Sequence, residues 1–218
     1  MRSRRPPERG FTAVEMLIVL AIVSMAASLL LPNLMAMVHR GKIEGTCGRT
    51  AMLMQKARFE AMKRGVPTVV TIDPATNTIF AFADVHGAAA TDPSDGLFNP
   101  IDGMVYRSTD YELGRYRLPA GVTFTSPDDT GMDSVDGFVN DGTPDPPDKQ
   151  AIYLPDGTLV DSGAFRFADN RGNFLEIRAE PIATAKLQIR KHDLTLPANG
   201  DGSHWYARRE GGKPWHWL

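Results

Sequence analysis

The chain has 218 residues, of which 42% are hydrophobic and 23% charged, and its formal net charge is −2. This length suits one domain plus an anchor, and the slightly acidic balance argues against a general nucleic-acid-binding surface, which would be basic. The single cysteine, Cys47, excludes an internal disulfide, so we expect either a small buried apolar residue or pairing with a second molecule.

The N-terminus is basic and is followed by a long apolar stretch. Residues 1–10 hold four arginines and one glutamate, a charge of +3, so the remainder of the chain carries −5. From Met16 to Val38 no residue is charged, and this exceeds the roughly 20 residues that a membrane-spanning helix needs. The positive-inside rule then predicts that the N-terminus stays in the cytoplasm.

One carboxylate, Glu15, lies at the start of this apolar stretch, five residues after Gly10. A carboxylate at the centre of a membrane helix costs about 2.5–3.5 kcal/mol on insertion scales, so a compensating interaction is expected. Cleavage after Gly10 would make Phe11 a new amino terminus one helical turn from Glu15. The carboxylate could then meet that amine or the amine of a neighbouring subunit, as in a filament of stacked hydrophobic helices.

Two simpler interpretations remain open for this segment. An ordinary signal peptide has a basic start, a short apolar core and a small-residue cleavage site, and Ser24-Met25-Ala26 fits such a site. The apolar run continues through Leu29, Leu30 and Leu31, however. A plain membrane anchor explains the length of the run but neither Glu15 nor the Gly10–Phe11 junction.

Gly10-Phe11-Thr12, Glu15 and the apolar stretch resemble the class III leader and N-terminal helix of type IV pilins and of type II secretion pseudopilins. The resemblance implies cleavage by a prepilin peptidase between Gly10 and Phe11, and methylation of Phe11. It also implies a single-pass protein of the bacterial inner membrane with a periplasmic C-terminal domain. The partners implied are other pilins or pseudopilins in a filament and an inner-membrane assembly platform. Pro32 falls where pilin helices usually carry a kinking proline.

The pattern after Pro32 predicts that the helix resumes. Apolar residues recur at spacings of four, seven, three and four, which places them on one helix face: Ile43, Cys47, Met54, Ala57 and Ala61. Glu60 and Arg64 have the favoured i, i+4 order, and Gly65 followed by Pro67 is a stop signal. Gly41, Gly45 and Gly48 weaken the middle of this helix and predict a flexible zone between anchor and domain.

Beyond Gly65 the pattern changes to short strands. Strands are expected at Thr68–Ile72, Thr78–Phe82, Met104–Arg107, Val122–Ser126, Ala151–Leu154, Ala164–Ala168, Phe174–Ala179 and Ala183–Arg190. In the last of these, Lys186, Gln188 and Arg190 alternate with apolar residues, which predicts one solvated face. The predicted fold class is α+β, with a long N-terminal transmembrane helix packed on a mostly antiparallel β-sandwich.

A second resemblance concerns the helix end. Residues 56–67 followed by the Thr68–Ile72 strand are similar to the GspH/FimT branch of minor pilins, and Ile152–Gly157 resembles a later turn of that branch. The domain organisation expected is a leader at 1–10, a transmembrane and filament-core helix at 11–38 and a helix continuation at 39–65. A β-rich periplasmic domain at 66–203 and a Trp/Arg-rich tail at 204–218 complete it.

The C-terminal region departs from that branch. Thr184-Ala185-Lys186-Leu187 stands where the branch often has a Thr-Gly-Arg motif, and in FimT-type pilins the Gly-Arg-x-Arg region is linked with DNA binding. The cations that remain as candidate nucleic-acid contacts are Lys186, Arg190, Lys191, Arg208 and Arg209. Tail aromatics beside arginine could stack on bases; the alternatives are a tail docked on the sandwich or a disordered one. Nucleic acid is not expected as a partner.

Residues 127–149 contain seven aspartates among glycines and prolines. Carboxylates suit Ca²⁺, but the spacing matches no EF-hand, so we expect a solvated loop and no cofactor, with Ca²⁺ as the alternative. The five histidines are scattered and no catalytic motif is present, so no enzyme is expected.

The sequence therefore predicts a minor pseudopilin that initiates or caps a type II secretion pseudopilus for protein export. The alternative is a type IV pilus minor pilin for pilus assembly, adhesion or DNA uptake.

Overall fold

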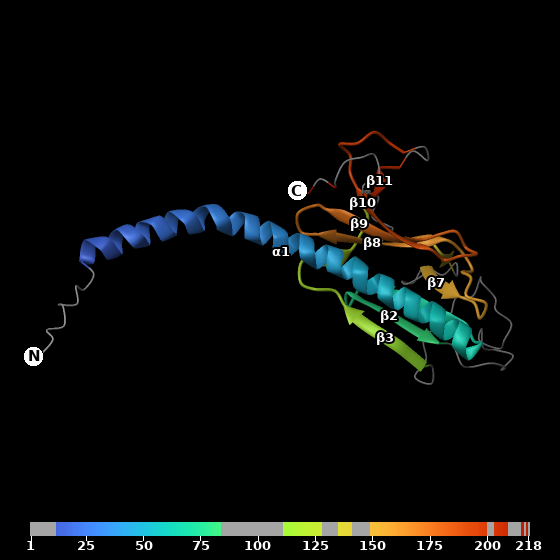
Figure 1. Cartoon of the computed structure of the whole chain (residues 1–218). Helices are drawn as coiled ribbons and strands as arrows, with labels where there is room; N and C mark the ends of the chain where they lie inside the picture. Colours follow the sequence, from blue (N-terminus) through green and yellow to red (C-terminus); the bar gives the residue numbers. More distant parts are fainter. Residues whose placement is uncertain are drawn as a thin grey trace, which may run out of the picture. The chain divides into compact units, whose positions relative to one another are not determined.

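The computed structural model describes residues 12–83, 111–127, 135–140, 149–199, 203–208, 215 and 217. The chain divides into two compact units, one up to Arg40 and one from Gly41 onward. The first unit consists of the N-terminal part of helix α1 (Ala13–Arg64), and the second holds the rest of that helix and all the described strands (Figure 1).

Helix α1 ends where the sequence predicts. Its last residue is Arg64, and Gly65 follows with φ 69°, a left-handed conformation that glycine adopts without strain. The helix runs without interruption through Gly41, Gly45 and Gly48, so the backbone there is not melted. That these glycines make a flexible zone stays a prediction. Each helical glycine costs up to about 1 kcal/mol relative to alanine, and burial of Ile43 and Cys47 beside these glycines offsets that cost.

The first sheet has the strand order β3-β2-β1-β7-β6. Its members are β1 (Thr68–Asp73), β2 (Thr78–Ala83), β3 (Tyr111–Arg117), β6 (Val139–Asn140) and β7 (Lys149–Tyr153). The predicted hairpin is confirmed: β1 and β2 are antiparallel, with Asp73 opposite Thr78. The Asp73 carboxylate closes the turn by accepting hydrogen bonds from the backbone N–H of Ala75 and Thr76, which is a local mimic of a backbone turn.

The second sheet has the strand order β11-β10-β9-β8-β4, and β5 pairs with β8 beside this path. The strands are β4 (Val122–Phe124), β5 (Val135–Gly137), β8 (Gly163–Asp169), β9 (Phe174–Ala179), β10 (Leu187–His192) and β11 (Trp205–Ala207). All of their described pairings are antiparallel. The α+β class with mostly antiparallel sheets is therefore confirmed.

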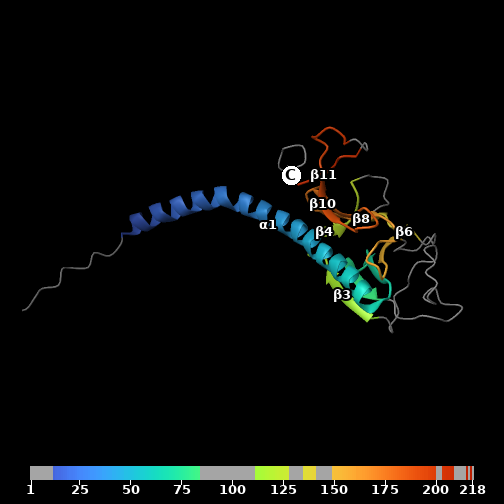
Figure 2. The same cartoon turned by 45° about the vertical axis from the view of Figure 1, so that its right-hand side comes forward.

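The C-terminal part of helix α1 lies along both sheets (Figures 1 and 2). The five residues predicted for its buried face are all fully buried in the core: Ile43, Cys47, Met54, Ala57 and Ala61. They share one cluster with Ile72 of the first sheet and Phe165 of the second. Hydrogen bonds add to this packing, because Lys56 Nζ donates to the carbonyl oxygen of Leu113 at 2.5 Å.

Two predictions about strands were wrong. The strand expected at Ala183–Arg190 begins only at Leu187, because the preceding residues form a turn in which the Ala185 N–H donates to Pro181 at 2.8 Å. The expectation of a solvated loop at 127–149 was also wrong in part, because β5 and β6 lie within it and pair with β8 and β7. Strands β3 and β11 were not predicted either. The strand expected at Met104–Arg107 lies outside the described residues.

Candidate functional site

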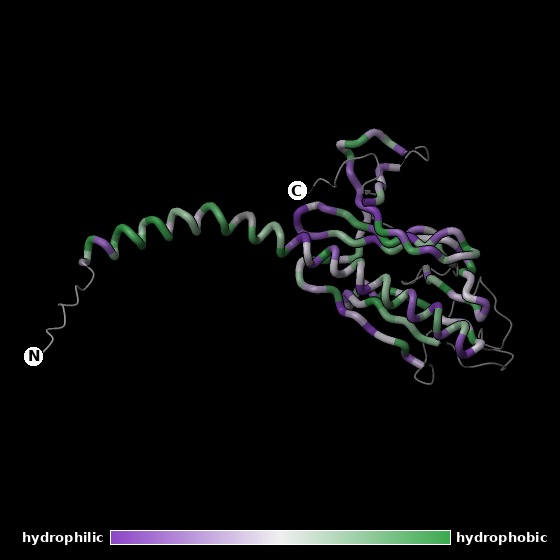
Figure 3. The backbone as a smooth tube through the Cα atoms, viewed as in Figure 1, coloured by the Kyte–Doolittle hydropathy of each residue, from purple (hydrophilic) through white to green (hydrophobic). Residues whose placement is uncertain are grey.

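The N-terminal unit presents apolar side chains on all sides. In the described part of helix α1 up to Val38, Leu17 is 66% exposed, Ile22 63% and Leu29 68%, and the most apolar window has no residue buried within the chain. Figure 3 shows this segment as a nearly continuous hydrophobic tube. A surface of this kind is unfavourable in water, and α1 is the helix long and apolar enough to cross a membrane.

The hydroxyl groups within this segment are satisfied by the helix itself. Ser24 Oγ donates to the carbonyl oxygen of Leu20 at 2.7 Å, and Ser28 Oγ donates to that of Met25 at 2.8 Å. A lipid-exposed segment needs such internal partners because hydrocarbon offers none.

Glu15 forms a capping box with Thr12. The backbone N–H of Thr12 donates to Glu15 Oε2 at 2.8 Å, and the Glu15 N–H donates to Thr12 Oγ1 at 3.2 Å. This reciprocal arrangement satisfies two N–H groups that a helix start leaves free. The capping box was not predicted, although its sequence signal, threonine followed three residues later by glutamate, is present at positions 12–15.

The capping box defines where the Glu15 carboxylate lies. Its Oε2 atom also accepts from the Thr12 hydroxyl at 2.9 Å, so the negative charge is held at the residue next to Phe11 in the chain. Gly10 and Phe11 themselves lie outside the described residues. Pro32 lies within α1, and the helix continues through it.

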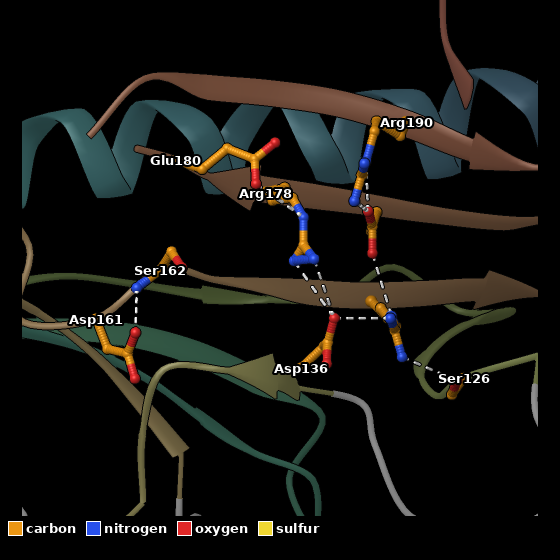
Figure 4. Close-up of polar contacts among 9 residues, drawn as sticks. Ser126, Asp136, Asp161, Ser162, Arg178, Glu180 and Arg190 are labelled. Atoms are coloured by element: carbon orange, nitrogen blue, oxygen red, sulfur yellow. Dashed lines mark hydrogen bonds and ion pairs between the residues drawn. The ribbon is translucent and has the colours of Figure 1, made fainter. Parts of the chain in front are cut away.

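A buried charged cluster covers the face of the second sheet that points away from the apolar core (Figure 4). Glu176 of β9 is fully buried between two arginines from the flanking strands. Arg190 Nε donates to Glu176 Oε1 at 2.6 Å, and Arg166 Nε donates to Oε2 at 3.2 Å. Arg166 also donates to Asp136 Oδ2 at 2.9 Å.

The same cluster corrects the expectation of a solvated face on β10. The Arg190 side chain is only 11% exposed, and the Arg166 guanidinium lies over the Trp205 ring, 5.1 Å from its centroid. At Arg190 the polar alternation therefore marks a covered charge, because neighbouring strands supply complementary charges and β11 supplies an aromatic cover, whereas Lys186 is exposed as expected.

Among the described residues, the candidate nucleic-acid contacts do not form a continuous row of exposed cations. Arg190 is paired with Glu176, and Lys191 is 4% exposed with its Nζ donating to the carbonyl oxygen of His192. Burial lowers the pKa of Lys191. Arg208 is exposed and lies over the Trp215 ring, Lys186 is exposed beside the turn before β10, and Arg209 lies outside the described residues.

The described part of the tail docks on the second sheet. Trp205 and Tyr206 are each 5% exposed, and β11 pairs with β10 through His192 and Trp205. Trp215 Nε1 donates to the carbonyl oxygen of Tyr206 at 3.0 Å. These aromatic groups are therefore occupied by contacts within the chain.

Among the described residues, no group of three or more His, Cys, Asp or Glu side chains could hold a metal ion. Within the acidic 127–149 segment, Asp136 is described, and its carboxylate contacts Arg166 and Arg178. The other six aspartates of that segment lie outside the described residues. Cys47 is fully buried, and burial raises the pKa of its thiol.

A long apolar N-terminal helix whose C-terminal part packs on antiparallel sheets is the architecture that the sequence resemblance implies. The fold is pilin-like. No family model and no curated protein matches the chain. Two solved structures of the minor pseudopilin EpsH from the type 2 secretion system of Vibrio cholerae are similar at low identity.

The first of these has 12% sequence identity and a TM-score of 0.39, and the match covers 68% of this chain and 95% of that one. The second has 14% identity and a TM-score of 0.38, with 67% and 92% covered. Because both similarities are this distant, the function of this chain is inferred from its own residues.

Proposed function

We propose that this chain is a minor pseudopilin or pilin, a non-enzymatic structural subunit of a membrane-anchored filament. The observation that carries the proposal is helix α1, whose apolar side chains are exposed over its N-terminal part, whereas one face of its C-terminal part, from Ile43 to Ala61, is buried in the core. One helix thus offers a surface for lipid or for other helices, and also organises the folded domain. Membranes and filament cores both cover such a surface.

Glu15 is the proposed assembly residue. Its carboxylate accepts hydrogen bonds from the backbone N–H and the hydroxyl of Thr12, the residue that follows Phe11 in the chain. Cleavage between Gly10 and Phe11 by a prepilin peptidase would create a cationic amino terminus one residue before Thr12 and four residues before Glu15. An amine of the same or a neighbouring subunit then offsets the cost of keeping the charge in an apolar environment.

We propose that the filament to which this subunit belongs is a type II secretion pseudopilus. The subunit initiates or caps that pseudopilus, and its folded domain lies in the periplasm. The alternative is a type IV pilus minor pilin. DNA uptake is the less favoured part of that alternative, because affinity for nucleic acid depends on free cations that neutralise phosphates, and Arg190 and Lys191 are engaged within the domain.

Terminal sequencing of the protein recovered from membranes tests the proposal. The mature chain should begin at methylated Phe11, and a chain beginning at Met1 or after Ala26 would exclude a pilin-type subunit. Deletion of the gene then separates the machines: loss of protein export with normal pilus functions supports the pseudopilus, and the reverse supports the pilus. A gel-shift titration at about 150 mM salt, where weak phosphate contacts are screened, tests the DNA-binding alternative directly.

A further inference from the structure

A pocket of about 540 Å³ opens between helix α1 and the turn that precedes β10, on the second unit. Met54 and Leu187 supply apolar walls, and Arg58, Thr184 and Lys186 supply polar groups. This volume lies within the range of ordinary ligand pockets, which combine apolar walls with a few polar groups. None of the described residues that line the pocket is a carboxylate.

The two cations of this pocket are uncompensated in the described part of the chain. Arg58 Nε is buried and has no hydrogen-bond partner, and neither Arg58 nor Lys186 forms an ion pair with a described residue. The other titratable group, Tyr153, is 1% exposed, and burial raises the pKa of its hydroxyl. Tyr153 is therefore neutral and does not balance the charge of Arg58.

The position of Arg58 is fixed by its surroundings. Its Nε atom lies 3.4 Å from where a Cβ on Gly157 would be, and the Met62 side chain fills the same space. Gly157 has φ 82°, so the turn between β7 and β8 passes directly over the arginine. A buried donor held in this way lacks the partner that buried polar groups normally have.

We propose that this pocket binds an acidic side chain of a partner subunit. The carboxylate pairs with the guanidinium of Arg58 and the ammonium of Lys186, the Thr184 hydroxyl donates a further hydrogen bond, and Leu187 covers the methylene groups of the guest. A carboxylate is one of the groups that a planar guanidinium binds with two parallel hydrogen bonds. That the carboxylate belongs to a partner subunit rests on the proposed function, which brings other subunits close to this domain. The charge complementarity between the pocket and a carboxylate does not depend on that function.

The test uses the full chain in nonionic detergent with ¹³C-methyl methionine, so that the Met54 methyl resonance reports on the pocket. The probe is the blocked peptide Ala-Leu-Glu-Leu-Ala, and its Gln analogue is the matched control. We expect the Glu peptide to shift the Met54 resonance and to bind at least tenfold more tightly than the Gln peptide. Arg58→Gln and Lys186→Gln should each weaken binding at least fivefold, whereas Arg49→Gln, on the same helix but outside the pocket, should leave it unchanged.

Several outcomes would overturn the proposal. The first is no shift of the Met54 resonance at up to about 5 mM peptide, a concentration that detects even millimolar dissociation constants. The second is equal affinity for the Glu and Gln peptides, and the third is that Arg49→Gln weakens binding as much as the two pocket substitutions do. Displacement by glutarate at equal concentration would assign the pocket to small dicarboxylates and would refute the partner source. If Arg58→Gln does not fold, Lys186→Gln decides, because Lys186 is exposed. Failure here leaves the terminal-sequencing result untouched, so the two proposals can fail separately.

Discussion

Replacing Glu176 with alanine should destabilise the second unit strongly. Glu176 is fully buried, and its two oxygens accept from Arg166 and Arg190, whose side chains are only 12% and 11% exposed. Removing one partner of a buried ion pair costs about 3–5 kcal/mol, because a buried charge is left without compensation. Arg166 retains Asp136 as a partner, so most of the cost falls on Arg190.

For a domain of this size, each kcal/mol lowers the melting temperature by about 2–4 °C, so we expect a decrease of about 6–20 °C for Glu176→Ala. Tryptophan fluorescence of the full chain in detergent is a suitable readout, since Trp205 lies over Arg166. The matched control is Glu60→Ala, which removes the more exposed helix pair with Arg64 and should have a much smaller effect. A decrease no larger than that of the control would refute the reasoning and show that water screens the cluster.

A double-mutant cycle separates pairing from packing. The effects of Glu176→Ala and Arg190→Ala on the free energy of unfolding should be coupled by at least about 1 kcal/mol, because the two residues contact each other. Replacing Arg166, Glu176 and Arg190 together by Met, Leu and Met should be close to neutral, since apolar groups of similar volume can substitute for a buried ionic cluster. Additive single effects would contradict direct coupling.

Three further predictions concern other parts of the chain. Gly10→Leu should block processing, so that intact mass spectrometry finds the full 218-residue chain; a normal cleaved mass would exclude this cleavage site. Glu15→Ala should leave membrane insertion and cleavage intact but reduce co-purification with partner subunits. Thr12→Ala, which removes the capping hydroxyl alone, should have a smaller effect. If both variants recover as much of the partner subunits as wild type does, Glu15 has no assembly role. Gly163→Ala should lower the free energy of unfolding by about 1–3 kcal/mol, because its Cβ would lie 2.5 Å from Phe138 Cγ and 2.6 Å from a backbone oxygen. Gly45→Ala, which meets no atom within 4 Å, is the control and should be neutral or slightly stabilising in thermal melts.

Local patterns predicted the elements that contribute many apolar residues to the core. The helical spacing from Ile43 to Ala61 identified a face that is fully buried, and the glycine at position 65 marked the helix end. Alternation over short runs was enough for β1, β2 and β9 because their inward residues are apolar.

Strand β3 was missed because Leu113 is its single buried residue; the rest of Tyr111–Arg117 is polar or half-exposed. The charged face of the second sheet could not be predicted because the burial of Glu176 depends on arginines from β8 and β10 and on an aromatic residue from β11. Those partners are brought together only by the sheet order. The pocket at Arg58 likewise depends on three separate segments, at residues 54–58, at Tyr153 and at residues 184–187.

The burial of Cys47 makes its thiol a natural probe of how readily the domain opens. Its sulfur is sealed between helix α1 and the sheets, and only a solvated thiolate reacts with alkylating reagents. Each labelling event therefore requires that the helix separate from the sheets, and the labelling rate, compared with that of the denatured chain, measures the free energy of that opening. Because this thiol is unique in the chain, the measurement needs no engineered probe, and it would report whether incorporation into a filament tightens the domain.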